Sequence, residues 1–253
     1  MLFTDHMSEI SRFDLFRLYW RSFFVQNGWS YERMMALGFV WILKPLTKRL
    51  FSTPAEQKSF LKRHLLSFNA NPYLVNYVVG AVVRMEEEKT PEEQIVKFKS
   101  SLRGPVGAIG DRLIWQNLRP ALLILGLILA VTIGALGALI FWLIFNLYQA
   151  FLRARGIVKG YDLGSGLSGE FTKGHLQSMI EWSSRLGAVL LGIIFVIKLG
   201  QLGIRPLHLE NILLLPGFIL LSVFAFRKNI NPNYTILFSI ALYLIIKTVI
   251  IYF

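Results

Sequence analysis

The chain contains no cysteine among its 253 residues, which excludes disulfide bonds, a thiolate nucleophile and any cysteine-ligated metal. Histidine is also scarce, and none of His6, His64, His175 and His208 has a second histidine at the spacing of a metal site. The sequence lacks a Walker phosphate loop and a Gly-x-Ser-x-Gly nucleophile motif. We therefore expect no catalytic residue, no metal and no cofactor.

Acidic residues are few, because 15 Asp and Glu stand against 27 Lys and Arg, giving a formal net charge of +12. Nucleic-acid binding is one explanation for such a balance. It is disfavoured here because many basic residues flank apolar runs, as Arg119, Arg153, Arg155, Arg185, Arg227 and Lys228 do. Cations at the ends of apolar runs are typical of membrane proteins. Residues 1–21 have no apolar core of a signal peptide, so we expect no cleavage there.

Hydrophobic residues make up 54% of the chain, and the long apolar runs lie after residue 119. We predict an all-α, polytopic membrane protein with amphipathic, cytosolic helices first, then re-entrant or broken helices and several transmembrane helices. The expected division is residues 1–119 and residues 120–253. No alternation typical of strands extends over a useful length.

The longest apolar run, residues 120–152, contains no charged side chain. A single straight helix of that length would measure roughly 50 Å, against a hydrocarbon core of about 30 Å. We therefore predict a break at residues 132–137, between segments 121–132 and 137–152 that form a re-entrant hairpin or two half-helices. Further apolar runs cover residues 186–197, 212–226 and 234–251.

Residues 104–111 read Gly-Pro-Val-Gly-Ala-Ile-Gly-Asp. Three glycines and a proline predict a break in the helix rather than a helix interior. A broken backbone with a carboxylate next to a membrane span is typical of a permeation site. The alternative is that Asp111 caps the helix that runs into Trp115, and the two interpretations are compatible.

Four other segments have clear local signals. Residues 14–29 are rich in aromatics and arginine, which favours either an interfacial membrane helix or a helix docked on a partner subunit. Thr53-Pro54 and Thr90-Pro91 each predict a helix start. Residues 156–174 are rich in glycine and predict a polar loop, cytosolic if the positive-inside rule holds.

Sugar sites combine aromatic faces with carboxylate or amide groups for the hydroxyls. Polar and aromatic residues of this kind lie beside predicted helix breaks or in apolar surroundings: Gln26, Trp29, Glu32, Asn69, Asn71, Glu86, Asp111 and Trp115. For each one alone, a structural hydrogen bond is the competing interpretation. Glu86 belongs to a run of three glutamates, which is typical of a solvated face, unless it faces a polar cavity.

The order of several motifs resembles the IID component of the mannose/fructose/sorbose family of the bacterial phosphotransferase system. The motifs include Trp-Ser-Tyr-Glu-Arg-Met at 29–34, Phe-Asn-Ala-Asn-Pro-Tyr at 68–73, Met-Glu-Glu-Glu-Lys at 85–89, Gly-Pro-Val-Gly-Ala-Ile-Gly-Asp at 104–111 and Arg-Lys-Asn-Ile-Asn-Pro at 227–232. The sequence departs from the family pattern at Asn27, Arg84, Arg103 and the pair Gln116-Asn117.

The resemblance implies a multi-pass subunit of the bacterial inner membrane that translocates a mannose-like hexose together with a IIC subunit. It also implies that cytosolic IIA and IIB components phosphorylate the sugar, and that the membrane part is a trimer of IIC–IID heterodimers in lipid. Two alternatives come from other classes: an intramembrane enzyme using Glu86 and Asp111 as acid and base, and a scaffold that transports nothing.

Overall fold

The computed structural model describes residues 10–173 and 175–201, with isolated positions 224, 228, 238, 241, 242 and 245. The chain forms two compact units, Met1–Gly192 and Ile193–Phe253. The predicted runs 212–226 and 234–251 and the motif at 227–232 lie almost wholly outside the described residues.

The described residues form helices and no strand, which confirms the predicted all-α class. The α-helices are α1 (Arg12–Ser22), α2 (Ala36–Leu43), α3 (Thr47–Leu50), α4 (Pro54–His64), α5 (Val75–Glu87), α6 (Glu92–Gly110), α7 (Arg119–Ile133), α8 (Ala135–Leu163), α9 (Ser168–Lys173) and α10 (His175–Gln201). Two short 3₁₀ turns, η1 (Lys44–Leu46) and η3 (Gly164–Leu167), and one π-helical segment, η2 (Asp111–Leu118), connect some of them.

Local chemistry determines where the first helices begin. Thr53 and Glu56 form a reciprocal capping box around Pro54 at the start of α4, as Thr53-Pro54 predicts. The second predicted start is only partly right, because α6 begins at Glu92 with Pro91 as its N-cap and no side-chain cap. In α1, Leu18 is buried whereas Phe13 is 66% exposed, so this helix has an aromatic outer face.

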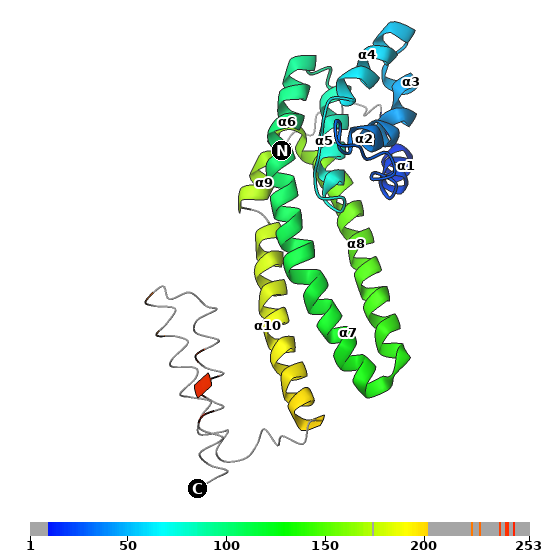
Figure 1. Ribbon diagram of the computed structural model, residues 1–253. Helices are drawn as coiled ribbons and strands as arrows, with labels where there is room; N and C mark the ends of the chain where they lie inside the picture. The colour runs from blue at the N-terminus through cyan, green and yellow to red at the C-terminus, as the bar shows by residue number, and fades with distance from the viewer. Residues whose placement is uncertain are drawn as a thin grey trace, which may run out of the picture. The chain divides into compact units, whose positions relative to one another are not determined.

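The uncharged run folds into a helical hairpin, which confirms the predicted break (Figure 1). Gly134 has φ +68 and separates α7 from α8. The two arms pack closely because a Cβ on Gly137 would lie 2.3 Å from the backbone nitrogen of Ala130. The predicted bounds 121–132 and 137–152 were too short, since helix continues from Glu92 to Ile133 and from Ala135 to Phe171.

The predicted helix break at residues 104–111 was wrong. Helix α6 continues through Pro105 to Gly110, and the irregularity begins only at Asp111, as the π-helical η2. A proline inside a helix costs about 3 kcal/mol. The buried side chains Leu102 and Val106 lie on the inner face on either side of this proline, and their packing holds the helix together.

The predicted polar loop at residues 156–174 was also wrong, because α8, η3 and α9 occupy it. Two of its glycines, Gly156 and Gly160, are contact positions rather than loop residues. A Cβ on Gly160 would lie 2.1 Å from the carbonyl oxygen of Tyr77, and one on Gly80 would lie 2.2 Å from that of Ile157. Small residues on both helices therefore let the backbones of α5 and α8 touch.

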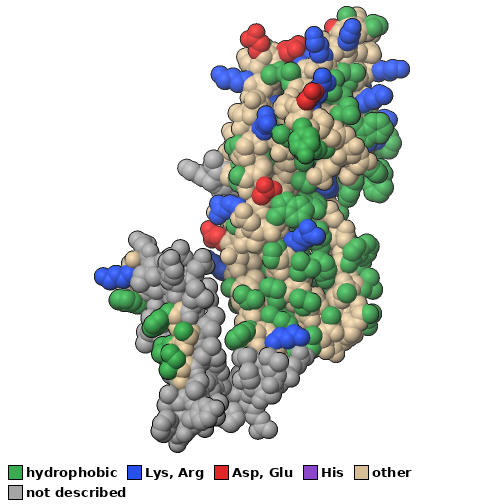
Figure 2. All heavy atoms as spheres, in the orientation of Figure 1, with side chains coloured by type: hydrophobic (Ala, Val, Ile, Leu, Met, Phe, Trp, Pro, Cys, Tyr) green, Lys and Arg blue, Asp and Glu red, His purple; other side chains and the backbone are tan. Residues whose placement is uncertain are grey.

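Three helices in the described part are long and apolar enough to cross a membrane: Glu92–Ile133, Ala135–Phe171 and His175–Lys198. On the face in Figure 2, charged side chains gather over the end that carries α1–α6, and hydrophobic side chains cover the hairpin. Exposed apolar residues of α7 and α8 include Leu127, Leu136, Trp142 and Leu147. These observations confirm a polytopic membrane protein with polar helices at its N-terminal end. The expected boundary at residue 119 falls inside continuous helix, at the first residue of α7.

Candidate functional site

The first part of the site is the turn before α5. The carbonyl of Asn71 accepts hydrogen bonds from the backbone N–H groups of Leu74 and Val75, both at 3.0 Å. Its side-chain oxygen accepts from the N–H of Tyr73 at 3.0 Å. Asn71 is only 1% exposed, so these bonds fix its amide in one orientation.

The second part is the π-helical segment η2. The Asn71 amide Nδ2 donates to Oδ1 of Asp111, the first residue of η2, at 3.0 Å. The turn before α5 and the start of η2 can approach each other because the residue before Asp111 is Gly110. A Cβ on Gly110 would lie 2.1 Å from Cβ of Asn71. Asp111 itself is exposed, so its carboxylate is held on one side and open on the other. Short π-helical segments occur frequently at functional sites.

Aromatic rings lie beside this polar pair. The ring centroids of Tyr73 and Trp115 are 5.6 Å apart, and the Arg119 guanidinium lies 5.1 Å from the Trp115 ring. Trp115 is 38% exposed and Tyr73 is half-buried. An oriented amide, a carboxylate and two aromatic rings thus come together from the start of α5 and from η2.

Arg153 of α8 packs against the Tyr73 ring. Its guanidinium is buried, lies 5.2 Å from the Tyr73 ring centroid and 4.9 Å from that of Phe23, and donates to the carbonyl of Ser22 at 2.8 Å. No carboxylate pairs with it among the residues that the structure describes. Ring faces and a carbonyl therefore balance this charge, and they tie α1, the turn before α5 and α8 together.

A separate buried cluster surrounds Glu86 near the end of α5. Arg63 donates to both carboxylate oxygens, at 2.8 and 2.5 Å, and His64 Nε2 lies 2.9 Å from Oε1. Burial opposes ionisation, but the hydrogen bonds from Arg63 and His64 and the charge of Arg63 outweigh it and hold the pKa of Glu86 below its ordinary value. Lys99 closes the cluster by donating to the carbonyl of His64 at 2.7 Å.

The structure brings together only part of the predicted site. Asn71, Asp111 and Trp115 form one cluster. Glu86 lies in the other, where its carboxylate is 3% exposed and already saturated. The remaining predicted residues are exposed, in the segments before α2 and before α5: Gln26, Trp29, Glu32 and Asn69. Trp29 packs its ring against Tyr31 with centroids 5.0 Å apart.

Two interpretations of Asp111 and Glu86 fail on geometry. Asp111 is not an N-cap, because its φ of −67° and ψ of −41° continue the helix from Gly110. Asp111 binds the turn before α5, whereas Glu86 follows Val75 by roughly 16 Å along α5 at about 1.5 Å per residue. An acid/base pair flanking one bond needs its carboxylates within roughly 10 Å. The proposed carboxylate-pair enzyme is therefore not supported.

Five residues of these clusters were not among the predicted site residues: Tyr73, Arg63, His64, Lys99 and Arg153. Tyr73 had a usable signal, since it follows Asn71-Pro72, a turn motif that places the next side chain at a helix start. Arg153 had one too, as the first charge after the uncharged run. The partners of Arg63 and Lys99 are more than 20 residues away, so no local pattern announces them.

Known proteins with a similar sequence or structure point to one family. A family model described as the PTS system mannose/fructose/sorbose family IID component matches residues 9–200. The mannose-specific EIID component of Escherichia coli (strain K12) is 30% identical over 261 residues, covering 92% of each chain. The sorbose-specific EIID component of Lacticaseibacillus casei is 31% identical over 251 residues, covering 89% of this chain and 88% of the relative.

A solved structure agrees with these relatives. It is the cryo-EM structure of the mannose transporter ManYZ in complex with microcin E492. One of its chains superposes with a TM-score of 0.59 and 26% sequence identity, over 93% of this chain and 95% of that chain.

Proposed function

This chain belongs to the mannose/fructose/sorbose IID family of the phosphotransferase system, and from that premise we propose that it carries a hexose across the membrane together with a IIC subunit. It is a membrane component of a sugar permease. In the proposed cycle a cytosolic IIB subunit, charged by IIA, phosphorylates the sugar, and this chain accepts no phosphoryl group. The proposed assembly is a trimer of IIC–IID heterodimers in the inner membrane of a bacterium.

The observation that carries the proposal is the cluster of Asn71, Asp111, Tyr73 and Trp115. A carboxylate that accepts from one amide keeps its second oxygen available for a sugar hydroxyl, and an exposed indole offers a flat face to the apolar side of a pyranose ring. The cluster lies one turn before the uncharged run of the hairpin, where a hydrophilic solute would enter or leave the membrane. We assign sugar contact to Asp111 and Trp115, with Tyr73 as an added member, and we assign to the buried Asn71 the role of orienting the Asp111 carboxylate.

The other predicted residues have weaker support. Gln26, Trp29, Glu32 and Asn69 are exposed and remain candidates for contact with the sugar through a surface completed by the IIC subunit. Glu86 is reassigned from sugar binding to structure, because Arg63 and His64 already occupy its carboxylate.

The test is hexose uptake by cells that express Asp111→Asn with all other components of the system. The substitution keeps the size of the side chain and removes the charge. We expect uptake to fall at least about tenfold, which corresponds to roughly 1.4 kcal/mol in binding or barrier. Asp162→Asn is the matched control, because Asp162 is exposed on α8.

Membrane abundance of the chain and its co-purification with the IIC subunit must be equal in the three strains. Uptake near wild type in Asp111→Asn would contradict the assignment of the site. Uptake that persists when this chain is deleted and IIC is retained would instead favour a scaffold that transports nothing. Mannose, fructose and sorbose, offered separately, distinguish the sugars.

A further inference from the structure

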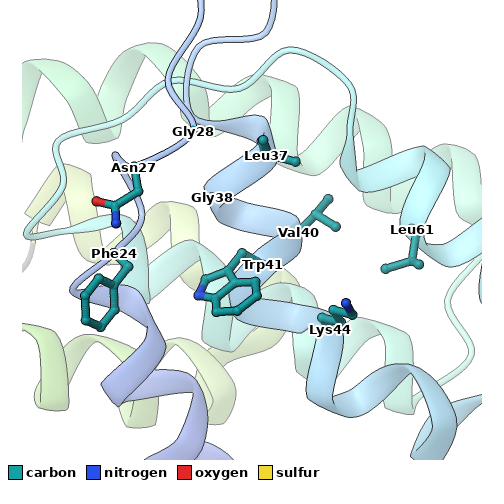
Figure 3. Close-up of a pocket in the computed structure, with 9 residues that line it drawn as sticks. All are labelled: Phe24, Asn27, Gly28, Leu37, Gly38, Val40, Trp41, Lys44 and Leu61. Atoms are coloured by element: carbon teal, nitrogen blue, oxygen red, sulfur yellow. The ribbon is translucent and has the colours of Figure 1, made fainter.

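Two adjoining hollows open on the surface between the end of α1, helix α2 and helix α4. The first has a volume of about 590 Å³ and apolar walls that include Phe24, Leu37, Val40, Trp41 and Leu61. Figure 3 places Trp41 and Val40 along α2, with Phe24 on one side and Leu61 on the other. This volume lies within the range of about 300–1,000 Å³ that is usual for small-molecule sites.

The second hollow, of about 460 Å³, has a different character, because basic side chains line it. These are Arg17, Arg21, Lys44 and Lys48, and no acidic residue lines either hollow. The two hollows share Trp41, Lys44 and Leu61, so an apolar space passes directly into a cationic one.

The basic side chains of the second hollow differ in whether they already have partners within the protein. Arg21 is fixed, since its Nε donates to the carbonyl of Trp41 at 2.8 Å and its guanidinium lies 3.7 Å from the centroid of the Trp41 ring. Lys44 and Lys48 are exposed, and neither forms an ion pair with another described residue. Two ammonium groups are thus available to an anion beside an apolar hollow.

The depth of the hollows in the membrane follows from Arg153. The uncharged run of the hairpin ends at this residue, and its guanidinium donates to the carbonyl of Ser22 at the end of α1. Phe24, two residues later, lines the first hollow. On the other arm, Trp115 and Arg119 stand where the run begins. Aromatic and basic residues at the ends of an apolar run mark the membrane–water interface.

We propose that the two hollows together bind one anionic phospholipid, with acyl chain in the apolar hollow and the phosphate against Lys44 and Lys48. Free phosphate would use the basic hollow and leave the apolar one empty. A zwitterionic lipid would fill the apolar hollow and leave two ammonium groups without an anion. Only an amphiphile with a net negative head group matches both surfaces at the interface.

Fluorescence quenching by brominated lipid tests the proposal, because bromine on an acyl chain quenches nearby indoles and Trp41 lines both hollows. Full-length chain, co-purified with its partner membrane subunit, is titrated with dibrominated phosphatidylglycerol or phosphatidylcholine in mixed micelles. The signal that disappears in Trp41→Phe is assigned to this site. We expect phosphatidylglycerol to quench it at a concentration at least about tenfold lower, as about 1 kcal/mol for each of the two lysines implies.

The lysines are tested by the double substitution Lys44→Gln/Lys48→Gln, which should weaken phosphatidylglycerol binding at least about tenfold and leave phosphatidylcholine binding unchanged. The control is Lys62→Gln/Lys97→Gln, which removes the same charge from two exposed lysines outside both hollows. Native mass spectrometry supplies a second measurement, in which the double variant should retain one phosphatidylglycerol fewer per chain.

Three outcomes would overturn the proposal. Equal quenching by the two lipids would show an apolar surface without head-group selection. An equal loss in the control pair would show a general charge effect. Absence of any Trp41 quenching, with cross-linking of Lys44 to the partner subunit, would show that protein covers the hollows.

Discussion

His64 is the residue whose protonation state matters most for the N-terminal helices. It is completely buried between Phe39 and Phe60, and burial lowers its pKa to about 4, although the contact with Glu86 acts in the opposite direction. The ring is therefore neutral at physiological pH, and its position against the carboxylate places the proton on Nε2.

The two shifted groups make the fold sensitive to acid in the same direction. An unfolded histidine takes up a proton near pH 6.5, well above the folded pKa of about 4, so the stability that depends on neutral His64 is lost as pH falls from 6.5 toward 4. Glu86, with a pKa below its ordinary value of 4.5, contributes stability that disappears as pH falls below 4.5. The contribution of His64 is on the order of 3 kcal/mol at most.

We predict that the thermal unfolding midpoint of the purified membrane complex decreases when the pH is lowered from 7 to 5. His64→Gln should make this pH dependence weaker. His175→Gln is the control, because His175 is exposed on α10. A pH profile unchanged by His64→Gln would mean that another group carries the acid sensitivity. Midpoints are read in detergent at fixed ionic strength.

At the scale of elements, the crossing of α5 and α8 holds the site in place. It joins the helix that begins beside Asn71 to the arm of the hairpin that carries Arg153. Asn76 of α5 donates to the carbonyl of Arg153 at 2.9 Å. On the next turns of α8, Gly156 and Gly160 lie directly against Tyr77 of α5. A side chain at either glycine would push the helices apart, since the Tyr77 ring fills the space at Gly156 and the Tyr77 backbone fills it at Gly160.

Two glycine-to-alanine substitutions distinguish a steric clash at a helix contact from the general effect of alanine on helix stability. Gly160→Ala should destabilise the protein by about 1–3 kcal/mol, because its methyl group meets the Tyr77 carbonyl. Gly107→Ala, in α6, has open space around the new methyl group and should stabilise by about 0.5–1 kcal/mol. The midpoints of thermal or denaturant unfolding of the two variants should therefore move in opposite directions. An unchanged or higher midpoint in Gly160→Ala would contradict the packing of α5 on α8.

These glycines also show what the sequence can predict. The apolar run without charge predicts the hairpin because its length is set by the membrane, and Gly134 supplies the turn. The capped start at Thr53 is predicted because all its partners are local. Gly110, Gly156 and Gly160 were misread as breakers, since only tertiary contacts distinguish a glycine at a close approach from one in a loop.

For the candidate site, the sequence indicates some of the residues but not their arrangement. Asn71, Asp111 and Trp115 stand out as polar or aromatic residues near irregular backbone, and the structure gathers them. Their relation depends on Gly110, which allows close approach, and on the π-helical register of η2, which no propensity predicts. The partners of Glu86 could not be predicted in the same way, because Arg63 and His64, which occupy its carboxylate, lie on a different helix.

At the scale of the whole molecule, the apolar surface of the α7–α8 hairpin must be covered by lipid or by another protein. Large apolar side chains are exposed on both arms of the hairpin, including Leu127 at 58% and Leu147 at 68%. Lipid or another subunit of the permease covers a surface of this kind. Under our proposal the sugar path runs between this chain and IIC, with the Asp111 cluster as one wall.

The most direct measurement is the equilibrium binding of hexose to the purified complex of this chain with its partner subunit, without the cytosolic components. Isothermal titration calorimetry of wild type and Asp111→Asn removes phosphorylation and expression from the comparison. If Asp111 contacts the sugar, the Kd of the variant should rise at least about tenfold, or roughly 1.4 kcal/mol, whereas Asp162→Asn should match wild type. An unchanged Kd in Asp111→Asn would contradict the claim that this chain forms part of the sugar site.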